Sequence, residues 1–337
     1  MTSNLISRAR DGDADAFREL TEPHRRELHV HCYRMLGSFQ DAEDALQDTL
    51  LLAWQGFARF EERASIRTWL FRIATNRCLD VLRANKRRPP REWSLPGVEP
   101  PEPTRLGEVM WLEPYPDALL DPAIDVPLGP AARYEQTEAI SLAFVTALQV
   151  LPGRQRAVLI LRDVLGYHAS EVADMLNSTL ESVNSALKRA RARVQQLPAL
   201  RDRQPPPAAN SAAEEALVAE FARAYQAGDI DALVALLTED AFVSMPPVPL
   251  EYQGKEVVAR FYASLLHSRR YELVPTRANG QPAFGTYLRA TSGGIRHGAG
   301  LIVLTLSGSH ISAMTRFDNN ALTWFGLPQS LPRSHTR

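Results

Sequence analysis

The chain has 337 residues, of which 45% are hydrophobic, and a formal net charge of −1. This length predicts two or three domains, and the hydrophobic content is sufficient for packed cores. The near-zero charge excludes a uniformly basic binder, so any nucleic-acid surface must be confined to particular segments. Only two cysteines occur, and no signal peptide or apolar run of membrane-spanning length is seen. These features predict a cytoplasmic protein without a membrane partner.

The first segment, up to about residue 60, has the periodicity of helices. Apolar residues recur at helical intervals between residues 5 and 36, and Gly37 breaks the pattern. His29, His31 and Cys32 could be read as metal ligands, but their spacing is not that of a zinc finger and no second ligand pair follows. We therefore expect helix residues that are at least partly buried, with no metal and no cofactor.

A further helix is predicted from Asp41, with an apolar side that reaches Trp54 and an acidic side opposite. The acidic side carries Asp41, Glu43, Asp44, Gln47 and Asp48. Carboxylates at the start of a helix are favoured by its macrodipole. On these residues alone, capping and solubility explain the acidic side as well as a binding role does.

The stretch from Arg63 to Arg91 combines an amphipathic helix with positive charge. It holds nine Arg or Lys residues and one acid, Asp80. At 100° per residue one face collects Ile66, Leu70, Ile73, Ala74 and Val81, and the opposite face Thr68, Arg72, Thr75, Asn76 and Arg83. Prolines then end the helix, so the positive charge gathers at its C-terminus. A nucleic-acid surface and an ordinary core helix with a solvated basic face are both consistent with this pattern.

DAEDALQDTLLLAW followed by SIRTWLFRIATNRCLDVLRANKRRP resembles regions 2.1 to 2.4 of an extracytoplasmic-function sigma factor of the sigma-70 family. The resemblance spans most of residues 5 to 91. It implies that the acidic helix docks on core RNA polymerase, with Asp41, Asp44, Gln47 and Asp48 as contacts. It implies that the next helix captures the melted −10 element, with contacts from Arg67, Trp69, Arg72, Asn76, Arg77, Lys86, Arg87 and Arg88. An intrahelical ion pair between Arg77 and Asp80 is an alternative role for Arg77.

Residues 92–133 are predicted to be a linker. Between Glu92 and Pro130 there are nine prolines, eight acids and a single base, Arg105. This composition favours a semi-extended, negative chain. The aromatic and aliphatic side chains of WLEPYPDALLD would be wasted in a purely solvated spacer. A packing contact is therefore predicted for Trp111, Leu112, Glu113 and Pro114. WLEP resembles an element of sigma factors with an extra C-terminal domain, which implies that linker and domain touch; a disordered spacer is the alternative.

Residues 134–198 are predicted to form a second helical unit. Its last helix has a stripe of Leu180, Val183, Leu187, Ala190 and Val194, and a short helix from about Ser170 precedes it. Between the two, Asn177 suits a turn that requires positive φ, and Thr179 suits an N-cap. This is the pattern of a helix-turn-helix, although any three-helix bundle can imitate it.

The segment LPGRQRAVLILRDVLGYHASEVADML with VNSALKRARARV resembles sigma region 4, which reads the −35 element in the major groove. The resemblance implies that base edges and phosphates are contacted by Asn184, Ser185, Lys188 and Arg189, and the DNA backbone by Arg191 and Arg193. One departure is His168, which stands near a position where the family usually has a small hydroxyl cap.

After a second linker at 199–211, residues 212–329 predict an α+β domain. Helices are expected at about 213–226, 230–237 and 255–266, and strands after Tyr271. AYQAGDIDALVALLTEDAFVSMPP and RFDNNALTWFGLP resemble the SnoaL-like branch of the NTF2-like superfamily, whose folds are cones with a pocket. His297, Asp318 and Arg289 are candidate acid/base residues, but no spacing singles them out. Catalysis, small-molecule sensing and regulation of the sigma regions all remain open for this domain.

The predicted fold is therefore multidomain: residues 1–91 and 134–198 form two all-α domains, and an α+β cone follows. The predicted function is that of a sigma factor, with core RNA polymerase and promoter DNA as partners and a small-molecule ligand of the C-terminal pocket as a further candidate. The C-terminal domain is expected to regulate in cis and not to be an enzyme. The alternative is an NTF2-like enzyme or ligand sensor fused to a DNA-binding regulator.

Overall fold

A computed structural model describes residues 2–84, 91–93, 99–107, 111–120, 139–196, 204–267, 269–289 and 294–332. The chain divides into two compact units. The first contains Met1–Arg88 and Phe144–Arg201, and the second contains Pro89–Ala143 and Asp202–Arg337. Within the described ranges, no helix is long and apolar enough to cross a membrane.

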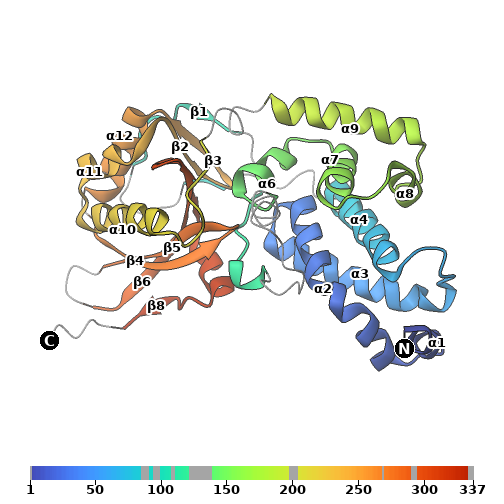
Figure 1. Ribbon diagram of the computed structural model, residues 1–337. Coiled ribbons are helices and arrows are strands. Elements are labelled where there is room, and N and C mark those ends of the chain that lie inside the picture. Colours follow the sequence, from blue (N-terminus) through green and yellow to red (C-terminus); the bar gives the residue numbers. More distant parts are fainter. Residues whose placement is uncertain are drawn as a thin grey trace. The chain divides into compact units, whose positions relative to one another are not determined.

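The first half of unit 1 is a set of packed helices, drawn in blue in Figure 1. They are α1 (Thr2–Arg10), α2 (Ala14–Leu36), α3 (Phe39–Gly56), the short η1 (Phe57–Arg59) and α4 (Ile66–Ala84). Asp13 caps α2 by accepting from the backbone N–H groups of residues 15 and 16, and Gly37 ends it at φ 76°. Ser38 caps α3. The break at Gly37 thus stands where the sequence predicts it, whereas α3 begins two residues before the predicted start at Asp41, because Ser38 caps it.

The second half of unit 1 is the predicted helix-turn-helix and the helices before it. It comprises α6 (Leu142–Gln149), α7 (Gly153–Leu159), a π-helical turn η3 (Ile160–Val164), α8 (Ala169–Met175) and α9 (Leu180–Gln195). Arg156 of α7 is 4% exposed, and its guanidinium donates to the carbonyl oxygens of Met35 on α2 and of Leu151. The two halves therefore pack on each other through α2, α4 and α7.

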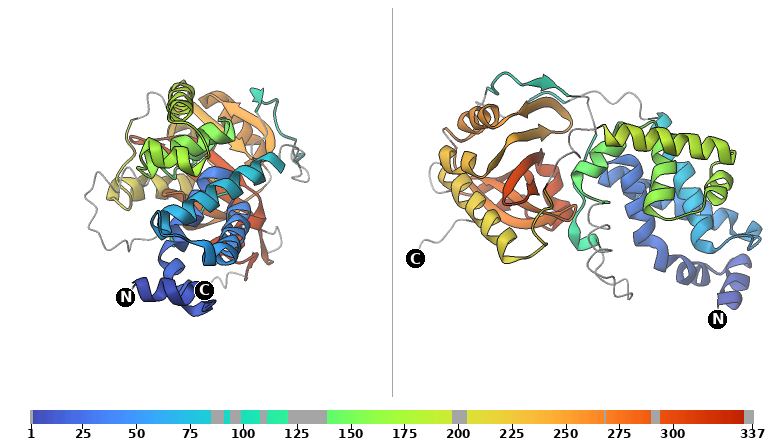
Figure 2. Two further views of the ribbon diagram at one scale, coloured as in Figure 1. Left: turned by 90° about the vertical axis from the view of Figure 1, so that its right-hand side faces the viewer. Right: turned by 45° about the horizontal axis from the view of Figure 1, so that its top comes forward.

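Unit 2 is a curved mixed sheet with helices on one face. Its helices are α10 (Ala212–Ala227), α11 (Ile230–Ala235) and α12 (Lys255–Leu266), with short turns η2 (Asp117–Leu119) and η5 (Asn319–Phe325). The strands are β1 (Arg105–Leu106), β2 (Leu237–Met245), β3 (Val248–Gln253), β4 (Tyr271–Ala278), β5 (Gln281–Leu288), β6 (Arg296–Ser307), β7 (His310–Phe317) and β8 (Ser330–Leu331). Figures 1 and 2 show α10, α11 and α12 against the sheet.

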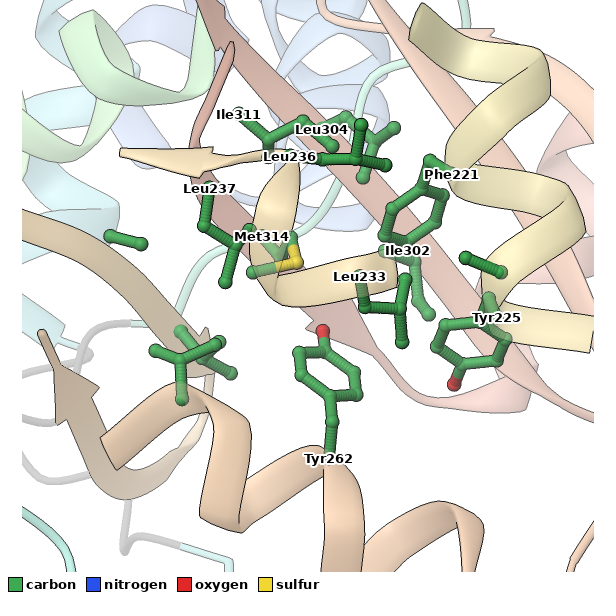
Figure 3. Close-up of a cluster of buried hydrophobic side chains, with 14 of the residues drawn as sticks. Phe221, Tyr225, Leu233, Leu236, Leu237, Tyr262, Ile302, Leu304, Ile311 and Met314 are labelled. Carbon is green, nitrogen blue, oxygen red and sulfur yellow. The ribbon is translucent and has the colours of Figure 1, made fainter. Parts of the chain in front are cut away.

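The strand order in unit 2 is β1-β3-β2-β7-β6-β5-β4, and β8 pairs with β6. The β2–β7 pair is parallel and the other pairs are antiparallel. The core lies between the helices and the sheet, and Figure 3 shows part of it, including Phe221, Tyr225, Tyr262, Ile302 and Met314. The predicted fold class, helical regions followed by an α+β cone, is confirmed.

Two differences from the sequence prediction concern strands. β2 and β3 lie before Tyr271, where only helices and connections were expected. Residues 237–245 lack strict alternation and follow α11 without a break, so local periodicity does not reveal the strand. β1 lies in the predicted linker and exists only because β3 offers it an edge, which sequence pattern cannot show.

Candidate nucleic-acid and protein interfaces

The acidic side of α3 carries the predicted polymerase contacts. Asp44 and Gln47 are exposed, and Asp41 and Asp48 are half-buried. Gln47 donates to Glu43 (3.2 Å), whereas Asp48 accepts from the guanidinium of Arg77 on α4 (2.7 Å). The carboxylate of Asp48 is therefore partly engaged within the fold.

Two exposed leucines on α3 were not singled out by the sequence. Leu51 and Leu52 keep 54% and 47% of their surface exposed, and they follow the acidic residues along the same helix. Large exposed aliphatic side chains beside polar ones are typical of protein contact surfaces. The signal was present in the run LLLAW, whose three leucines cannot all face one core.

Arg77 does not make the predicted intrahelical pair. Its guanidinium lies 2.6 Å from Asp48, while Asp80 pairs with Arg83. Arg77 is on the flank of α4 that faces α3, where its side chain is only 35% exposed and a carboxylate is already in place. Arg83 is three residues beyond Asp80 on an open surface, so it takes the partner that Arg77 leaves.

Trp69 packs into an aromatic group at the end of α3. Its ring centroid lies 5.7 Å from that of Phe57 and 5.0 Å from that of Phe60. The side chain is half-buried. Contacts with Phe57 and Phe60 thus fix the Trp69 ring, and the part of its surface that stays exposed is what it can offer to a base.

Three predicted −10 contacts are engaged by the helix-turn-helix within unit 1. Arg67 donates to the hydroxyl of Tyr167 (3.0 Å) and pairs with Glu27. Asn76 donates to the carbonyl oxygen of Met175 (3.1 Å). Arg72 donates to the side-chain oxygen of Asn177 (3.4 Å). The Glu27 carboxylate raises the pKa of Arg67, so this guanidinium is charged at any physiological pH. Glu27 and Tyr167 come from distant segments, and no local pattern indicated them.

Thr75 is buried, although the projection placed it on the outward face of α4. Its hydroxyl donates to the Phe71 carbonyl oxygen (2.7 Å) and lies 2.9 Å from the His31 Nε2 atom. The helix buries a wider arc than the apolar stripe suggested, because Thr75 satisfies its hydroxyl inside the core. Burial lowers the pKa of His31 to about 3, so this imidazole is neutral. Among the described residues, no group of His, Cys, Asp and Glu has the arrangement of a metal site.

The turn between α8 and α9 has the geometry that its residues predict. Asn177 has φ 46°, and the Thr179 hydroxyl accepts from the Ser182 N–H (3.2 Å). His168 stands at the start of α8, where its N–H donates to the Glu171 carboxylate (2.7 Å). That bond satisfies the His168 N–H through the Glu171 side chain. The start of α8 is therefore stabilised although His168 stands where the family usually has a small hydroxyl cap.

The outward face of α9 is polar and basic. Its predicted contact residues are all exposed: Asn184, Ser185, Lys188, Arg189, Arg191 and Arg193. Arg189 donates to Ser185 (2.7 Å), and Arg191 is held in a two-bond pair by Asp163 (2.8 and 2.6 Å). The opposite face buries Val183, Leu187 and Ala190, whereas Leu180 is 51% exposed, contrary to the predicted stripe. Leu180 is the first residue of the helix and lies past the edge of the packed surface.

The predicted phosphate contacts Lys86, Arg87 and Arg88 lie outside the described residues. The WLEP segment is described, and the residues that follow it, Tyr115 and Pro116, contact the end of β4 within unit 2. Leu112 and Pro114 are buried, and Trp111 and Glu113 are half-buried. The next residue, Tyr115, is bonded in both directions to Asn279: its N–H donates to the Asn279 side-chain oxygen (2.8 Å), and its carbonyl accepts from the Asn279 N–H (2.9 Å).

Among the described residues, the candidate acid/base residues of the C-terminal domain make no hydrogen bond or ion pair with one another. Asp318 caps η5 through the Asn320 N–H (3.0 Å) and pairs with Arg91. His297 is exposed on β6. Arg289 is exposed just after β5.

Three protein families match successive parts of the chain. Sigma-70 region 2 matches residues 20–88, Sigma-70 region 4 matches 141–194, and the SnoaL-like domain matches 218–318. The ECF RNA polymerase sigma factor SigG of Mycobacterium tuberculosis is 42% identical over 333 residues, which cover 96% of this chain and 86% of SigG. The chain belongs to the family of ECF RNA polymerase sigma factors.

Other ECF sigma factors agree with this assignment. SigM of Mycobacterium tuberculosis is 33% identical over 186 residues, covering 55% of this chain and 79% of SigM. The crystal structure of SigJ from the same species covers 91% of this chain and 98% of its own, at 21% identity and a TM-score of 0.58. At that identity the likeness concerns the fold alone, which SigJ shares with this sigma factor.

Proposed function

We propose that this sigma factor joins core RNA polymerase through α3, holds the melted −10 strand on α4 and reads the −35 duplex with α9. It would act in the cytoplasm, with the polymerase. The outward face of α9 carries the proposal: it is exposed, basic and polar, and it follows a capped helix-turn-helix turn. Cations on such a face neutralise phosphates, and Asn and Arg side chains can pair with base edges.

The proposed polymerase surface is Asp44, Gln47, Leu51 and Leu52 on α3. Carboxylate and amide groups beside exposed leucines give a polar and an apolar contact on one helix. Asp48 contributes less in this proposal, because Arg77 already neutralises it.

Run-off transcription with purified core and the full chain tests these assignments. We expect Lys188→Ala and Arg189→Ala to lower promoter-dependent transcription while core binding stays unchanged, and Asp44→Arg to weaken core binding itself. Arg223→Ala, on an exposed position of α10, is the matched control. Loss of core binding in the α9 variants, or unchanged transcription in them, would contradict the proposed division of roles.

For the C-terminal domain we propose regulation in cis through the linker, and no catalysis. The support is the set of contacts within unit 2. Asn279 bonds to both backbone groups of Tyr115 and donates to the Ile140 carbonyl oxygen (2.8 Å), while Asp117 accepts from the Gly280 N–H (2.7 Å). β1 of the linker also pairs with β3. The described parts of the segment between regions 2 and 4 are thus bonded to the sheet of this domain.

Asn279→Gly isolates this linkage. Glycine tolerates the φ of 58° that Asn279 adopts, so the change removes the side-chain bonds without backbone strain. We expect altered run-off activity with unchanged thermal stability of unit 1. Asn210→Gly, at an exposed residue with φ 59°, is the control. Equal transcription by both variants and by the unaltered chain would exclude control through this contact.

A further inference from the structure

Arg316 is an inward-facing cation of the C-terminal domain. It lies on β7, where its Cα partner on β6 is Ile302, and Met314 is opposite Leu304. Directly opposed residues of an antiparallel pair share a face of the sheet. Ile302, Leu304 and Met314 belong to the core cluster beneath the helices, as Figure 3 shows, so Arg316 points to the same interior.

The guanidinium of Arg316 has no counter-ion within the described part of the chain. The residue is 9% exposed, its Nη2 atom donates to the Ala299 carbonyl oxygen (3.2 Å), and its Nη1 atom is buried without a partner. The other arginines on this sheet with well-covered side chains are paired: Arg277 with Glu214 (2.8 Å) and Arg296 with Glu272. A buried and uncompensated charge is costly, so an anion is the partner that Arg316 lacks.

Tyrosine side chains surround the same interior. Tyr225 on α10 has its ring centroid 5.8 Å from that of Tyr262 on α12 and 5.7 Å from that of Tyr271 on β4. Within the described ranges, the buried hydroxyls of Tyr225 and Tyr271 have no hydrogen-bond partners. Figure 3 shows Tyr262 directed from α12 into the cluster, toward Met314. Two unused hydroxyl donors and one unused guanidinium donor thus come from three elements of the domain.

The tyrosines cannot themselves neutralise Arg316. Burial raises the pKa values of Tyr225 and Tyr262, and this effect is larger than the lowering caused by the positive charge of Arg316. Both phenols are therefore neutral at physiological pH and can donate hydrogen bonds. Water could satisfy the hydroxyls, but it would leave the charge of Arg316 uncompensated.

We propose that the interior of the C-terminal domain binds a small organic carboxylate, with Arg316 as its counter-ion and the hydroxyls of Tyr225 and Tyr271 as further donors. Charge-assisted bonds to a guanidinium favour a carboxylate. The surrounding wall includes Phe221, Phe261 and Met314, which suits an apolar or aromatic body on the ligand. Such a ligand would be a signal for the regulatory role proposed for this domain. Binding of the carboxylate can be tested whether or not the domain regulates transcription.

Thermal unfolding and calorimetric titration of the full chain test the site, with benzoate, acetate and inorganic phosphate as probes. We expect benzoate to raise the unfolding temperature in a saturable way, beyond a sodium chloride control of equal ionic strength, because a ligand that binds only the folded chain stabilises it. We expect acetate, which lacks the aromatic body, to act more weakly. Arg316→Gln should weaken benzoate binding by about 10- to 100-fold, the loss of a charge-assisted hydrogen bond.

Arg260→Gln, at an exposed position of α12, is the matched control and should bind benzoate like the unaltered chain. If Arg316→Gln does not fold, Tyr271→Phe carries the test and should weaken binding several-fold. Absence of any carboxylate effect on the unaltered chain would overturn the proposal, and so would undiminished binding by Arg316→Gln. A response to phosphate alone would overturn the ligand class. Because no readout involves transcription, failure here is distinct from failure of the promoter-binding proposal.

Discussion

Arg67 illustrates how a residue of the predicted −10 surface also serves the fold. It bonds to Glu27 and to the Tyr167 hydroxyl, and its guanidinium carbon lies 4.8 Å from the Phe71 ring centroid. Arg72 is exposed, and its side chain makes a single 3.4 Å contact among the residues that the structure describes. Replacing Arg67 should therefore lower the free energy of unfolding more than replacing Arg72, although the sequence predicts the same role for both.

We expect Arg67→Ala to lower the free energy of unfolding by about 1–2 kcal/mol, because charged hydrogen bonds are lost and Glu27 is left without its partner. Arg72→Ala should change stability by less than about 0.5 kcal/mol and should weaken capture of single-stranded −10 DNA. Urea unfolding and oligonucleotide binding measure the two effects. The reverse pattern would contradict the assignment of these residues.

His31 provides a pH-dependent test of the region 2 core. Its pKa is about 3 in the folded chain, against an ordinary value of 6.5 when the imidazole is exposed on unfolding, so below pH 6.5 the unfolded chain binds a proton that the folded chain does not. Stability contributed by neutral His31 is therefore complete above pH 6.5 and falls as the pH drops toward 3. Urea unfolding between pH 7 and 5 should show an average slope smaller by about 1 kcal/mol per pH unit in His31→Gln, with the difference approaching about 1.4 near pH 5. An equal slope would mean that His31 is accessible to protons.

On α9, Lys188 and Arg191 differ as Arg72 and Arg67 do: one is exposed and the other is engaged within the fold. Lys188 is exposed, whereas Arg191 is already paired with Asp163. Lys188→Ala should weaken −35 duplex binding and reduce the slope of log affinity against log salt by about 1, the effect of one lost phosphate contact. Arg191→Ala should have a smaller effect, because its pair must first be broken. Equal salt slopes in Lys188→Ala and the unaltered chain would remove Lys188 from the phosphate contacts.

At the scale of elements, the helix-turn-helix packs on the face of α4 that is proposed to hold single-stranded DNA. Tyr167 is 6% exposed, and its ring lies 6.0 Å from that of Phe71. The Met175 carbonyl oxygen accepts from Asn76. If α4 captures DNA as proposed, this arrangement would occupy the same groups, and we expect the two to exclude each other at Asn76.

Tyr167→Ala should loosen this packing and raise the affinity of the full chain for a −10 oligonucleotide, since a larger fraction of molecules is competent to bind. Tyr167→Phe keeps the ring and loses one hydrogen bond, so its effect should be smaller. Fluorescence anisotropy reports both affinities. Unchanged or weaker binding by Tyr167→Ala would show that the packing does not limit access to α4.

Much of the element order could be predicted from the sequence, because caps and periodicity are local signals. Asn177, Thr179 and the bounds of α12 stand where the pattern puts them. β1 and the β2–β7 pairing could not be predicted, since each depends on a partner strand far away in the chain, and the β2–β3 hairpin was missed because residues 237–245 lack strict alternation. For the interfaces, residue types and exposure on α9 followed from spacing, but the partners of Arg67 and Arg77 come from other helices.

At the scale of the whole molecule, the chain passes from unit 1 to unit 2, back to unit 1 and again to unit 2. Region 2 and most of region 4 lie in unit 1, while the segment that joins them belongs to unit 2 with the SnoaL-like domain. We expect a change in how that segment is held to be transmitted to both regions proposed to read DNA. This connectivity gives the C-terminal domain a route to regulation through the covalent chain itself.

The central claim is that this chain confers promoter-specific initiation on core RNA polymerase. Purified core, the full chain and fragmented genomic DNA can be combined, and the 5′ ends of the transcripts sequenced. We predict start sites that share a common pair of upstream −35 and −10 elements and that disappear with a Lys188→Ala, Arg189→Ala double variant. Transcripts no different from those of core alone would contradict the claim.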